Sequence, residues 1–177
     1  MSSSPPIEKT IICQDCVISN GVQIGGGTVL HPKASIIIEE GAGQIILGEN
    51  NIIEELVQII NRSKEKMIIG SNNLFEVGCI IECSSIGNQN VIESKSIISR
   101  DVVIGNGCSI SAKSIVPEKQ ILSDNTVISE TSSSFVNFHS KIPVEIHESI
   151  HSSHLELLHK TLPKFHNMKK YENKTST

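Results

Sequence analysis

Every sixth residue from Ile86 to Ile128 is aliphatic, and this period is the feature that most limits what the chain can form. An amphipathic helix repeats about every 3.6 residues and a half-buried strand every two, so neither produces a step of six. A small residue commonly follows each aliphatic residue four places on. This pattern is the hexapeptide signature of a parallel β-helix, in which three short strands make one triangular coil. The run consists of Ile86, Ile92, Ile98, Ile104, Ile110, Val116, Leu122 and Ile128.

The composition agrees with a stack of β-branched side chains. Thirty of the 177 residues are isoleucine, aromatic residues make up 3% and tryptophan is absent. Identical aliphatic side chains in successive coils can pack over one another without aromatic residues. A formal charge of −4 argues against nucleic-acid binding. Because no apolar run approaches the roughly 20 residues that cross a bilayer, and residues 1–6 lack signal-peptide features, we expect a soluble cytoplasmic protein.

The same step of six occurs earlier in the chain, so the repeat extends over most of it. We predict an all-β domain at residues 7–129, a parallel β-helix of about six to seven coils, after a disordered N-terminus at 1–6. Irregular steps place loops near 39–44 and at 61–66, and the hexad around Ile81 has lost one residue.

After Ile128 the hexad pattern stops, and the chain changes character. Residues 130–150 are interpreted as a linker, 151–171 as a C-terminal α-helix and 172–177 as a disordered tail. One apolar stripe of this helix should pack along a flat side of the β-helix. Pro163 should kink or split the helix, because it lacks a backbone donor. The predicted packing residues are Leu155, Leu158, Leu162, Phe165 and Met168.

One column of polar residues is a candidate interaction surface. Stacking the second hexad of each coil places His31, Glu54, Glu76 and Glu93 above one another, pointing outward. Carboxylates about 5 Å apart repel by about 1 kcal/mol per pair in water. Either nearby lysines neutralise the column, or a basic or hydrogen-bonding strip of a partner faces it. Asparagines in the preceding corner should hydrogen-bond along their own column and fix the register; they are Asn51, Asn73 and Asn90.

The cysteines and histidines do not form a pattern typical of a metal site or a catalytic site. Three of the five cysteines occupy the small-residue slot of the hexads and should be core fillers, and a single CxxC at 13–16 does not make a zinc knuckle. His147, His151 and His154 would share one helix face, where a metal patch competes with ordinary exposed surface. The sequence therefore predicts no catalytic residue, no cofactor and no metal.

Several segments are more specific than the hexad pattern. They are His31-Pro32-Lys33-Ala34, the stretches 47–55, 67–79 and 90–95, and the helical stretch 162–170. In this order they resemble the dynactin subunit 6 family of left-handed β-helix proteins. The resemblance covers roughly residues 18–171. It implies left-handed coiling and a non-catalytic structural or adaptor role in the pointed-end subcomplex of dynactin, which supports dynein-driven transport. It also implies a cytoplasmic, cytoskeleton-associated location.

The resemblance further implies the partners. In that family the protein pairs with the β-helix of dynactin subunit 5, beside the pointed-end actin-related protein and dynactin subunit 4. Dynein and cargo adaptors would be reached indirectly, with neither nucleic acid nor membrane insertion involved.

The alternative is a hexapeptide-repeat enzyme, because γ-class carbonic anhydrases and acyltransferases share the fold. The anhydrases hold their metal with three histidines from neighbouring coils. His31 is the single histidine within residues 7–129, which cannot supply that site. An acyltransferase would need a catalytic histidine, for which His31 is the single candidate within residues 7–129. We favour the interpretation of His31 as a surface corner residue. A shared fold does not confer activity.

Overall fold

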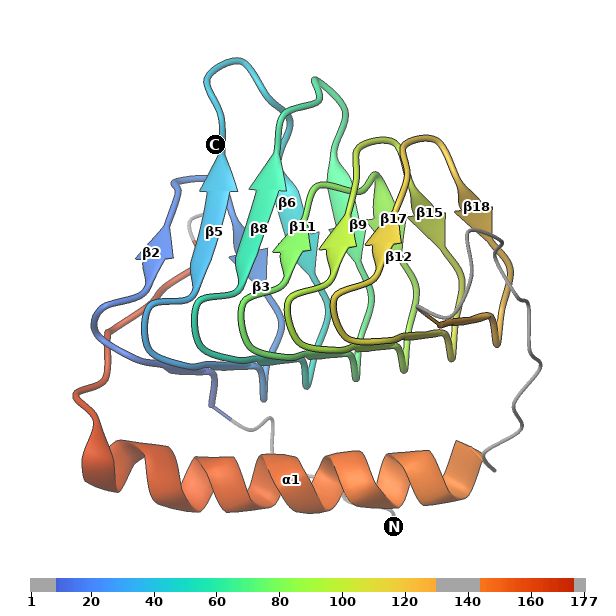
Figure 1. Cartoon of the computed structure of the whole chain (residues 1–177). Coiled ribbons are helices and arrows are strands. Elements are labelled where there is room, and N and C mark those ends of the chain that lie inside the picture. Colours follow the sequence, from blue (N-terminus) through green and yellow to red (C-terminus); the bar gives the residue numbers. More distant parts are fainter. Residues whose placement is uncertain (1–8, 130–143, 174–177) are drawn as a thin grey trace, which may run out of the picture.

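The computed structural model describes residues 9–129 and 144–173, which form a triangular β-helix with one α-helix along its side (Figure 1). Nineteen short strands follow one another in the chain before the helix α1 (Val144–Phe165). Their bounds are β1 Ile11–Ile12, β2 Val17–Ile18, β3 Gln23–Ile24, β4 Val29–Leu30, β5 Ser35–Ile38, β6 Ile45–Leu47, β7 Ile52–Ile53, β8 Gln58–Asn61, β9 Met67–Ile69, β10 Leu74–Phe75, β11 Ile80–Ile81, β12 Ser85–Ile86, β13 Val91–Ile92, β14 Ile97–Ile98, β15 Val103–Ile104, β16 Ser109–Ile110, β17 Ile115–Val116, β18 Ile121–Leu122 and β19 Val127–Ile128.

Each strand pairs in parallel with the strand three places later, which produces three sheets. Sheet 1 contains β1, β4, β7, β10, β13, β16 and β19. Sheet 2 contains β2, β5, β8, β11, β14 and β17, and sheet 3 contains β3, β6, β9, β12, β15 and β18. Every coil passes from sheet 1 to sheet 2 to sheet 3. Two sheets of six strands and one of seven confirm the prediction of six to seven coils.

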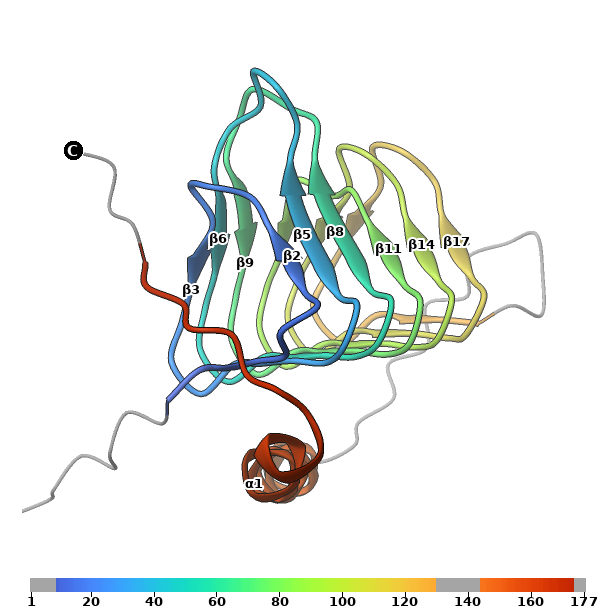
Figure 2. The same cartoon turned by 90° about the vertical axis from the view of Figure 1, so that its left-hand side faces the viewer.

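The coil is left-handed, as the family resemblance implied. Figure 2 looks along the axis from the N-terminal end. The chain rises through sheet 2 on the right, descends through sheet 3 on the left and returns along the bottom through sheet 1. An anticlockwise path that recedes from the viewer is a left-handed helix, whereas ordinary parallel crossovers are right-handed.

The hexad aliphatics fill the interior. All eight residues of the run from Ile86 to Ile128 are at most 7% exposed. Leu30, Ile53, Phe75 and Ile92 stack in register in sheet 1, as the step of six predicted. Because inward and outward positions alternate along a strand, the first residue of each two-residue strand points outward and the second points into the core.

The irregular steps lie at the corner between sheets 2 and 3. The predicted loop at 39–44 joins β5 to β6. The loop predicted at 61–66 joins β8 to β9 but begins at residue 62, because Asn61 belongs to β8, and both loops project from the body (Figure 1). Only residues 82–84 separate β11 from β12, which is where the hexad has lost a residue.

Helix α1 lies along the outer face of sheet 1 (Figures 1 and 2). Leu155, Leu158 and Leu162 are buried and belong to one apolar cluster with the outward residues Val29 and Ile52. These outward positions are aliphatic and fully buried, since the helix covers them. One sheet of the β-helix therefore has apolar residues on both of its faces.

The predicted bounds of the helix were wrong at both ends. The helix begins at Val144 instead of residue 151, and Ile146 and Ile150 in the added part are exposed. It runs through Pro163 as one helix, so the predicted split there did not occur, and it ends at Phe165 instead of 171. Residues 144–150 are thus helical and not linker, whereas 130–143 lie outside the described residues. Phe165 is 78% exposed, so its assignment to the packed stripe was also wrong.

The chain after the helix returns to the first coil. Met168 forms an antiparallel bridge with Cys13, the Gln14 amide donates to the Asn167 carbonyl at 2.8 Å and the Lys169 amide donates to the Ile12 carbonyl at 2.7 Å. Residues 167–169 therefore pair with residues 12–14 at the end of the edge strand β1, which would otherwise present unpaired backbone groups. The Asn173 side chain accepts a hydrogen bond from the Ile24 amide at 3.0 Å, so the predicted disordered tail at 172–177 begins too early.

Candidate functional site

The predicted column of carboxylates lies at the corner between sheets 1 and 2. Glu54, Glu76 and Glu93 directly follow β7, β10 and β13, and all three are half-buried. In the five turns along this corner that follow the first coil, the third residue has a positive φ, from 60° to 74°, which bends the chain sharply into sheet 2. These residues are Lys33, Leu56, Gly78, Lys95 and Lys113.

Each carboxylate is bound by the turn of the next coil. Glu54 Oε2 accepts a hydrogen bond from the Val77 amide at 3.1 Å, and Glu93 Oε2 accepts one from the Ala112 amide at 3.0 Å. Glu76 Oε2 accepts from both the amide and the hydroxyl of Ser94, at 3.0 and 2.9 Å. The column is therefore a ladder that links successive coils. Its outer oxygens, Oε1, have no hydrogen-bond partner among the described residues.

Burial and the charges of neighbouring carboxylates raise the pKa of Glu54 in this column. Burial raises the pKa of the Glu54 carboxyl, and the Val77 amide and the charge of His31 offset this only in part. The neighbouring carboxylate of Glu76 raises it further. Ionised Glu54 is thus held at a cost, which a nearby cationic surface would relieve.

His31 does not lie on the surface as predicted. It is 8% exposed, and its Nδ1 lies 3.1 Å from Glu55 Oε1, because the Glu55 side chain of the next coil folds against the ring. Burial is the largest single influence on Glu55 and opposes its ionisation. The hydrogen bond from His31, a bond from the Glu55 backbone amide and the charges of His31 and His166 together outweigh it and lower the pKa of the Glu55 carboxyl. His31 Nε2 is buried and has no hydrogen-bond partner within the part of the chain that the structure describes. An imidazole enclosed in this way is poorly placed to act on an outside substrate.

The asparagine column forms a second ladder at the corner between sheets 3 and 1. Asn51 Oδ1 accepts hydrogen bonds from the amide and side chain of Asn73, both at 3.0 Å. Asn73 Oδ1 accepts the same pair from Asn90, at 2.9 and 3.0 Å. All three side chains are fully buried. The sequence prediction that they bond along the column and hold the register agrees with these contacts.

The helix histidines attach α1 to that asparagine corner. His151 Nε2 donates to the Asn50 carbonyl at 2.7 Å, and His159 Nε2 lies 3.0 Å from the Gly27 carbonyl. His151 is 6% exposed, so the expectation that this histidine lies on exposed surface was wrong. Burial lowers the pKa of His151 and keeps the ring neutral. Among the described residues, no three His, Cys, Asp or Glu side chains converge in an arrangement that could bind a metal ion.

The cysteines behave as core residues. All five are buried and none forms a disulfide. Burial raises the pKa of Cys13 to about 11 and those of Cys16 and Cys83 to about 12, so the thiols stay protonated at neutral pH. Protonated thiols are poor nucleophiles and poor metal ligands. The motif at 13–16 therefore has a packing role.

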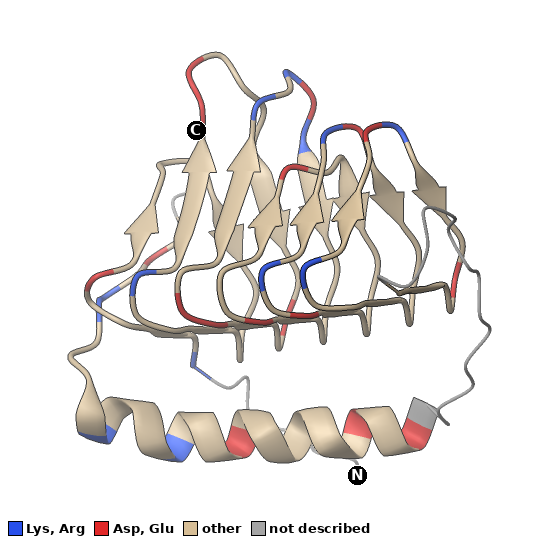
Figure 3. Cartoon of the chain, in the orientation of Figure 1, with Lys and Arg blue, Asp and Glu red and all other residues tan. Residues whose placement is uncertain are grey.

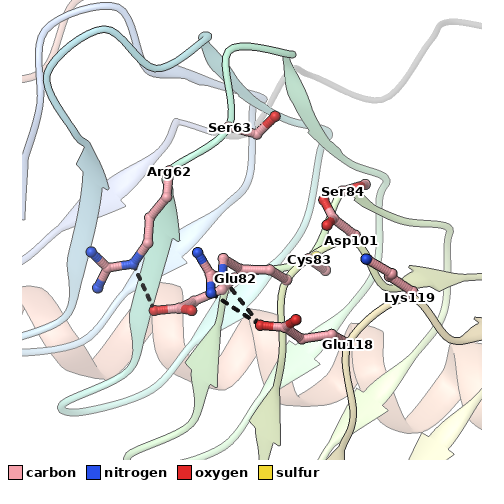
Figure 4. Close-up of a pocket in the computed structure, with 9 residues that line it drawn as sticks. Arg62, Ser63, Glu82, Cys83, Ser84, Asp101, Glu118 and Lys119 are labelled. Carbon is pink, nitrogen blue, oxygen red and sulfur yellow. Dashed lines mark hydrogen bonds and ion pairs between the residues drawn. The ribbon is translucent and has the colours of Figure 1, made fainter.

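A third polar column was missed in the sequence. At the corner between sheets 2 and 3, charges of alternating sign follow one another from coil to coil. Arg62 pairs with Glu39 and with Glu82, and Arg100 pairs with Glu118. A recess of about 330 Å³ lies among these side chains, beside the shortened turn at Ser84 (Figure 4). The alternation is hard to see in the sequence because the loops make its spacing irregular.

The chain is similar to several proteins named dynactin subunit 6. It is 60% identical over 164 residues to the one from Dictyostelium discoideum, across 93% of this chain and 87% of that protein. Identity is 39% with the Nematostella vectensis protein, across 91% and 89% of the two chains. It is 37% with the Danio rerio protein, across 90% and 84%. No family model matches the chain.

Solved structures resemble the fold at low identity. A Bacillus cereus protein considered an acetyltransferase superposes with a TM-score of 0.60 at 19% identity, across 86% of this chain and 91% of that one. A hexapeptide transferase family protein from Anaplasma phagocytophilum gives 0.55 at 16% identity, across 86% and 93%. These two likenesses concern the fold alone. Within the described residues, no helix is long and apolar enough to cross a lipid bilayer.

Proposed function

Because this chain belongs to the dynactin subunit 6 family, we propose that it is a structural, non-catalytic subunit of dynactin. The observation that supports this most directly is the 60% identity with the Dictyostelium discoideum protein over nearly the whole chain. The relatives from two animals match over similar lengths, so the likeness includes the tail helix as well as the coils.

The proposed role is exercised through surfaces within an assembly. The proposed partners are the β-helix of dynactin subunit 5, the pointed-end actin-related protein and dynactin subunit 4. Dynein and cargo adaptors would be engaged through the complex, in the cytoplasm and in association with the cytoskeleton. A non-catalytic role is supported by the enclosure of His31 against Glu55 and by the protonated, buried thiols.

The carboxylate column is the proposed contact for a basic or hydrogen-bonding strip of a partner. Glu76 Oε2 accepts hydrogen bonds from Ser94 of its own chain, whereas Oε1 can accept one from a partner. Glu76→Lys should therefore weaken recovery of that partner, whereas Glu76→Gln, which keeps an acceptor for the Ser94 amide, should weaken it less. Unchanged assembly with Glu76→Lys would contradict this role of the column.

The central experiment is purification of the tagged chain at its native abundance, followed by identification of the proteins that accompany it. We expect the other dynactin subunits in fixed proportion. A homotrimer that hydrates CO₂ or transfers an acyl group would contradict the proposal and favour the enzyme alternative, since enzymes of this fold commonly build sites between identical subunits.

A further inference from the structure

The tail that follows α1 holds the first coil through side chains as well as through its backbone. Asn173 Oδ1 accepts a hydrogen bond from the Ile24 amide at 3.0 Å, and Asn173 Nδ2 donates to the Ile24 carbonyl at 3.1 Å. One coil later, the equivalent carbonyl of Leu47 accepts from the Gly25 amide at 3.0 Å instead. The side-chain amide of Asn173 therefore takes the place of a preceding strand at the edge of sheet 3.

Tyr171, the single tyrosine of the chain, lies between the two other attachments of this tail. Its hydroxyl donates a hydrogen bond to the Val22 carbonyl at 2.5 Å, and its half-buried ring packs against the apolar core. Burial raises the pKa of the Tyr171 phenol, which therefore keeps its proton at neutral pH. Two residues earlier, the Lys169 ammonium group donates to the Cys16 carbonyl at 3.2 Å. Both contacts need a donor on the tail, because a carbonyl group can only accept.

A recess of about 410 Å³ lies between the tail and the turn that follows β2, and both Tyr171 and Val22 line it. The charged residues that line it are Lys169, Lys170 and Glu172, so one positive charge is in excess. Both lysines are exposed in the tail beyond α1 (Figure 3). Among the described residues, no carboxylate lies within ion-pair distance of the Lys170 ammonium group. The recess thus offers space and cationic partners for an anionic group attached beside it.

We propose that Tyr171 is a phosphorylation site and that its phosphorylation detaches the tail from the first coil. The co-reactants are ATP and a protein tyrosine kinase. The Tyr171 hydroxyl oxygen forms a bond to the γ-phosphorus of ATP, the bond from that phosphorus to the oxygen bridging it to the β-phosphate breaks, and ADP leaves. The phenolic proton passes to the catalytic base of the kinase. This inference goes beyond the proposed function and does not depend on it, because the isolated chain is sufficient to test it.

The phosphate ester removes two contacts of the tail at once. Its oxygen carries no proton and cannot donate to the Val22 carbonyl, and the phosphate places a charge of about −1.5 to −2 at pH 7 beside that carbonyl. The same charge attracts the Lys169 and Lys170 ammonium groups, so the phosphate competes with the Cys16 carbonyl for Lys169. The tail is then held by the pairing of residues 167–169 and by Asn173 alone, and it should open more often.

Local opening gives the kinase access to Tyr171. The flanking residues Lys170, Glu172 and Asn173 are exposed, and a few hydrogen bonds attach this part of the tail to the first coil. Segments of this kind open at a cost below the free energy of global unfolding. Phosphorylation then favours the open form, because the modified side chain no longer fits against Val22.

Treatment of the isolated chain with a broad-specificity tyrosine kinase domain and MgATP tests the first part of the proposal. Mass spectrometry should find one added phosphoryl group, located on Tyr171, and none on the Tyr171→Phe variant. An unstructured peptide that spans residues 167–173 is the positive control for the kinase. If the kinase labels the peptide but leaves Tyr171 of the folded chain unmodified, the proposal is wrong.

Amide hydrogen exchange, measured residue by residue by NMR, tests the detachment. The Ile24 amide reports on Asn173, and the Gln14 amide reports on the Asn167 carbonyl that accepts its hydrogen bond. The Gly48 amide is the matched control in the next coil, because it donates to the Ile69 carbonyl at 2.8 Å. Phosphorylation should speed exchange at Ile24 roughly tenfold and at Gln14 to a smaller extent, without a change at Gly48.

Two results would overturn the detachment. Unchanged exchange at Ile24 in the phosphorylated chain would show that the tail stays in place. Equal acceleration at Gly48 would show that the whole β-helix is destabilised. Tyr171→Phe separates the loss of the hydrogen bond from the added charge, since it keeps the ring and removes only the hydroxyl. Its Ile24 amide should exchange more slowly than that of the phosphorylated chain, and equal rates would contradict the competition for Lys169.

Discussion

Two corners of the β-helix hold polar ladders of opposite kinds. The corner between sheets 3 and 1 stacks asparagines that are fully buried, and α1 is fastened over it by His151. The corner between sheets 1 and 2 stacks carboxylates that are half-buried, each bonded to the next coil through one oxygen. Both ladders connect coils, but only the carboxylate ladder keeps acceptors that reach the surface.

This difference in burial gives the two ladders different roles, one in the stability of the fold and one in binding. A buried amide must satisfy all its donors and acceptors inside the chain, so it is committed to the fold. A half-exposed carboxylate can exchange water for a partner and keep its internal bond. We therefore expect substitutions in the asparagine ladder to act on stability and those in the carboxylate ladder to act mainly on binding.

The largest expected effect is that of Asn73→Ala. It removes hydrogen bonds to both neighbouring asparagines and leaves buried groups unsatisfied, so the free energy of unfolding should fall by about 3 kcal/mol. Urea unfolding measures this. A loss below that caused by Glu76→Ala would break the distinction between the two ladders.

Glu76→Ala should cost less, about 1.5 kcal/mol, because water can reach the Ser94 amide once the carboxylate is gone. Unfolding in the same denaturant gives the comparison. Glu76→Gln serves as the control and should recover part of the loss, since its amide oxygen still accepts a hydrogen bond. No difference between the two variants would mean that the bond contributes nothing.

The fastening of α1 should weaken in acid. The pKa of His151 is lowered by burial in the folded state, so the unfolded state binds more protons between that lowered pKa and about 6.5. Stability therefore rises with pH through this window and is lost as the pH falls, by at most about 1.4 kcal/mol per pH unit. His151→Gln, which can still donate to the Asn50 carbonyl, should flatten the dependence measured from pH 7 to pH 5.

The smallest effect is expected at Glu54, with the opposite sign. Because its folded-state pKa is raised, the folded state binds more protons just above pH 4.5, and its contribution to stability falls as the pH rises through that window. Glu54→Gln should stabilise the protein at pH 7 by about 0.5 kcal/mol after allowance for solvent screening. Thermal melts at pH 5 and pH 7 test this, and a loss of stability at pH 7 would contradict the sign.

The repeat itself was predictable because its physical cause is local. Coil number, loop positions and the asparagine column all follow from a step of six that each coil repeats. The hydrogen-bond donors that the carboxylates of Glu54, Glu76 and Glu93 contact were not predictable in the same way. They depend on turns with positive φ, which aim the amides of Val77, Ser94 and Ala112 back at the preceding coil.

The helix bounds were harder to predict, because only one face of α1 packs on sheet 1 and its first residues have no buried apolar stripe. Leu155, Leu158 and Leu162 marked the face that packs on sheet 1, but Ile146 and Ile150 lie on another face and did not extend the apparent stripe. His151 is polar by type and yet buried, since a backbone carbonyl accepts its hydrogen bond. A signal was present in the outward positions of sheet 1, where Val29 and Ile52 are aliphatic although a solvated face would favour polar residues.

The pairing of residues 167–169 with the end of β1 joins a late part of the described chain to its earliest strand. During synthesis on the ribosome, coils can stack in order as they emerge, but the backbone groups of β1 stay unpaired on one side until residues 167–169 have emerged. A nonsense mutation that removes this segment therefore leaves the hexads in place but exposes the unpaired backbone N–H and C=O groups of β1. Such truncated chains should be prone to aggregation and rapid degradation even though their hexads are complete.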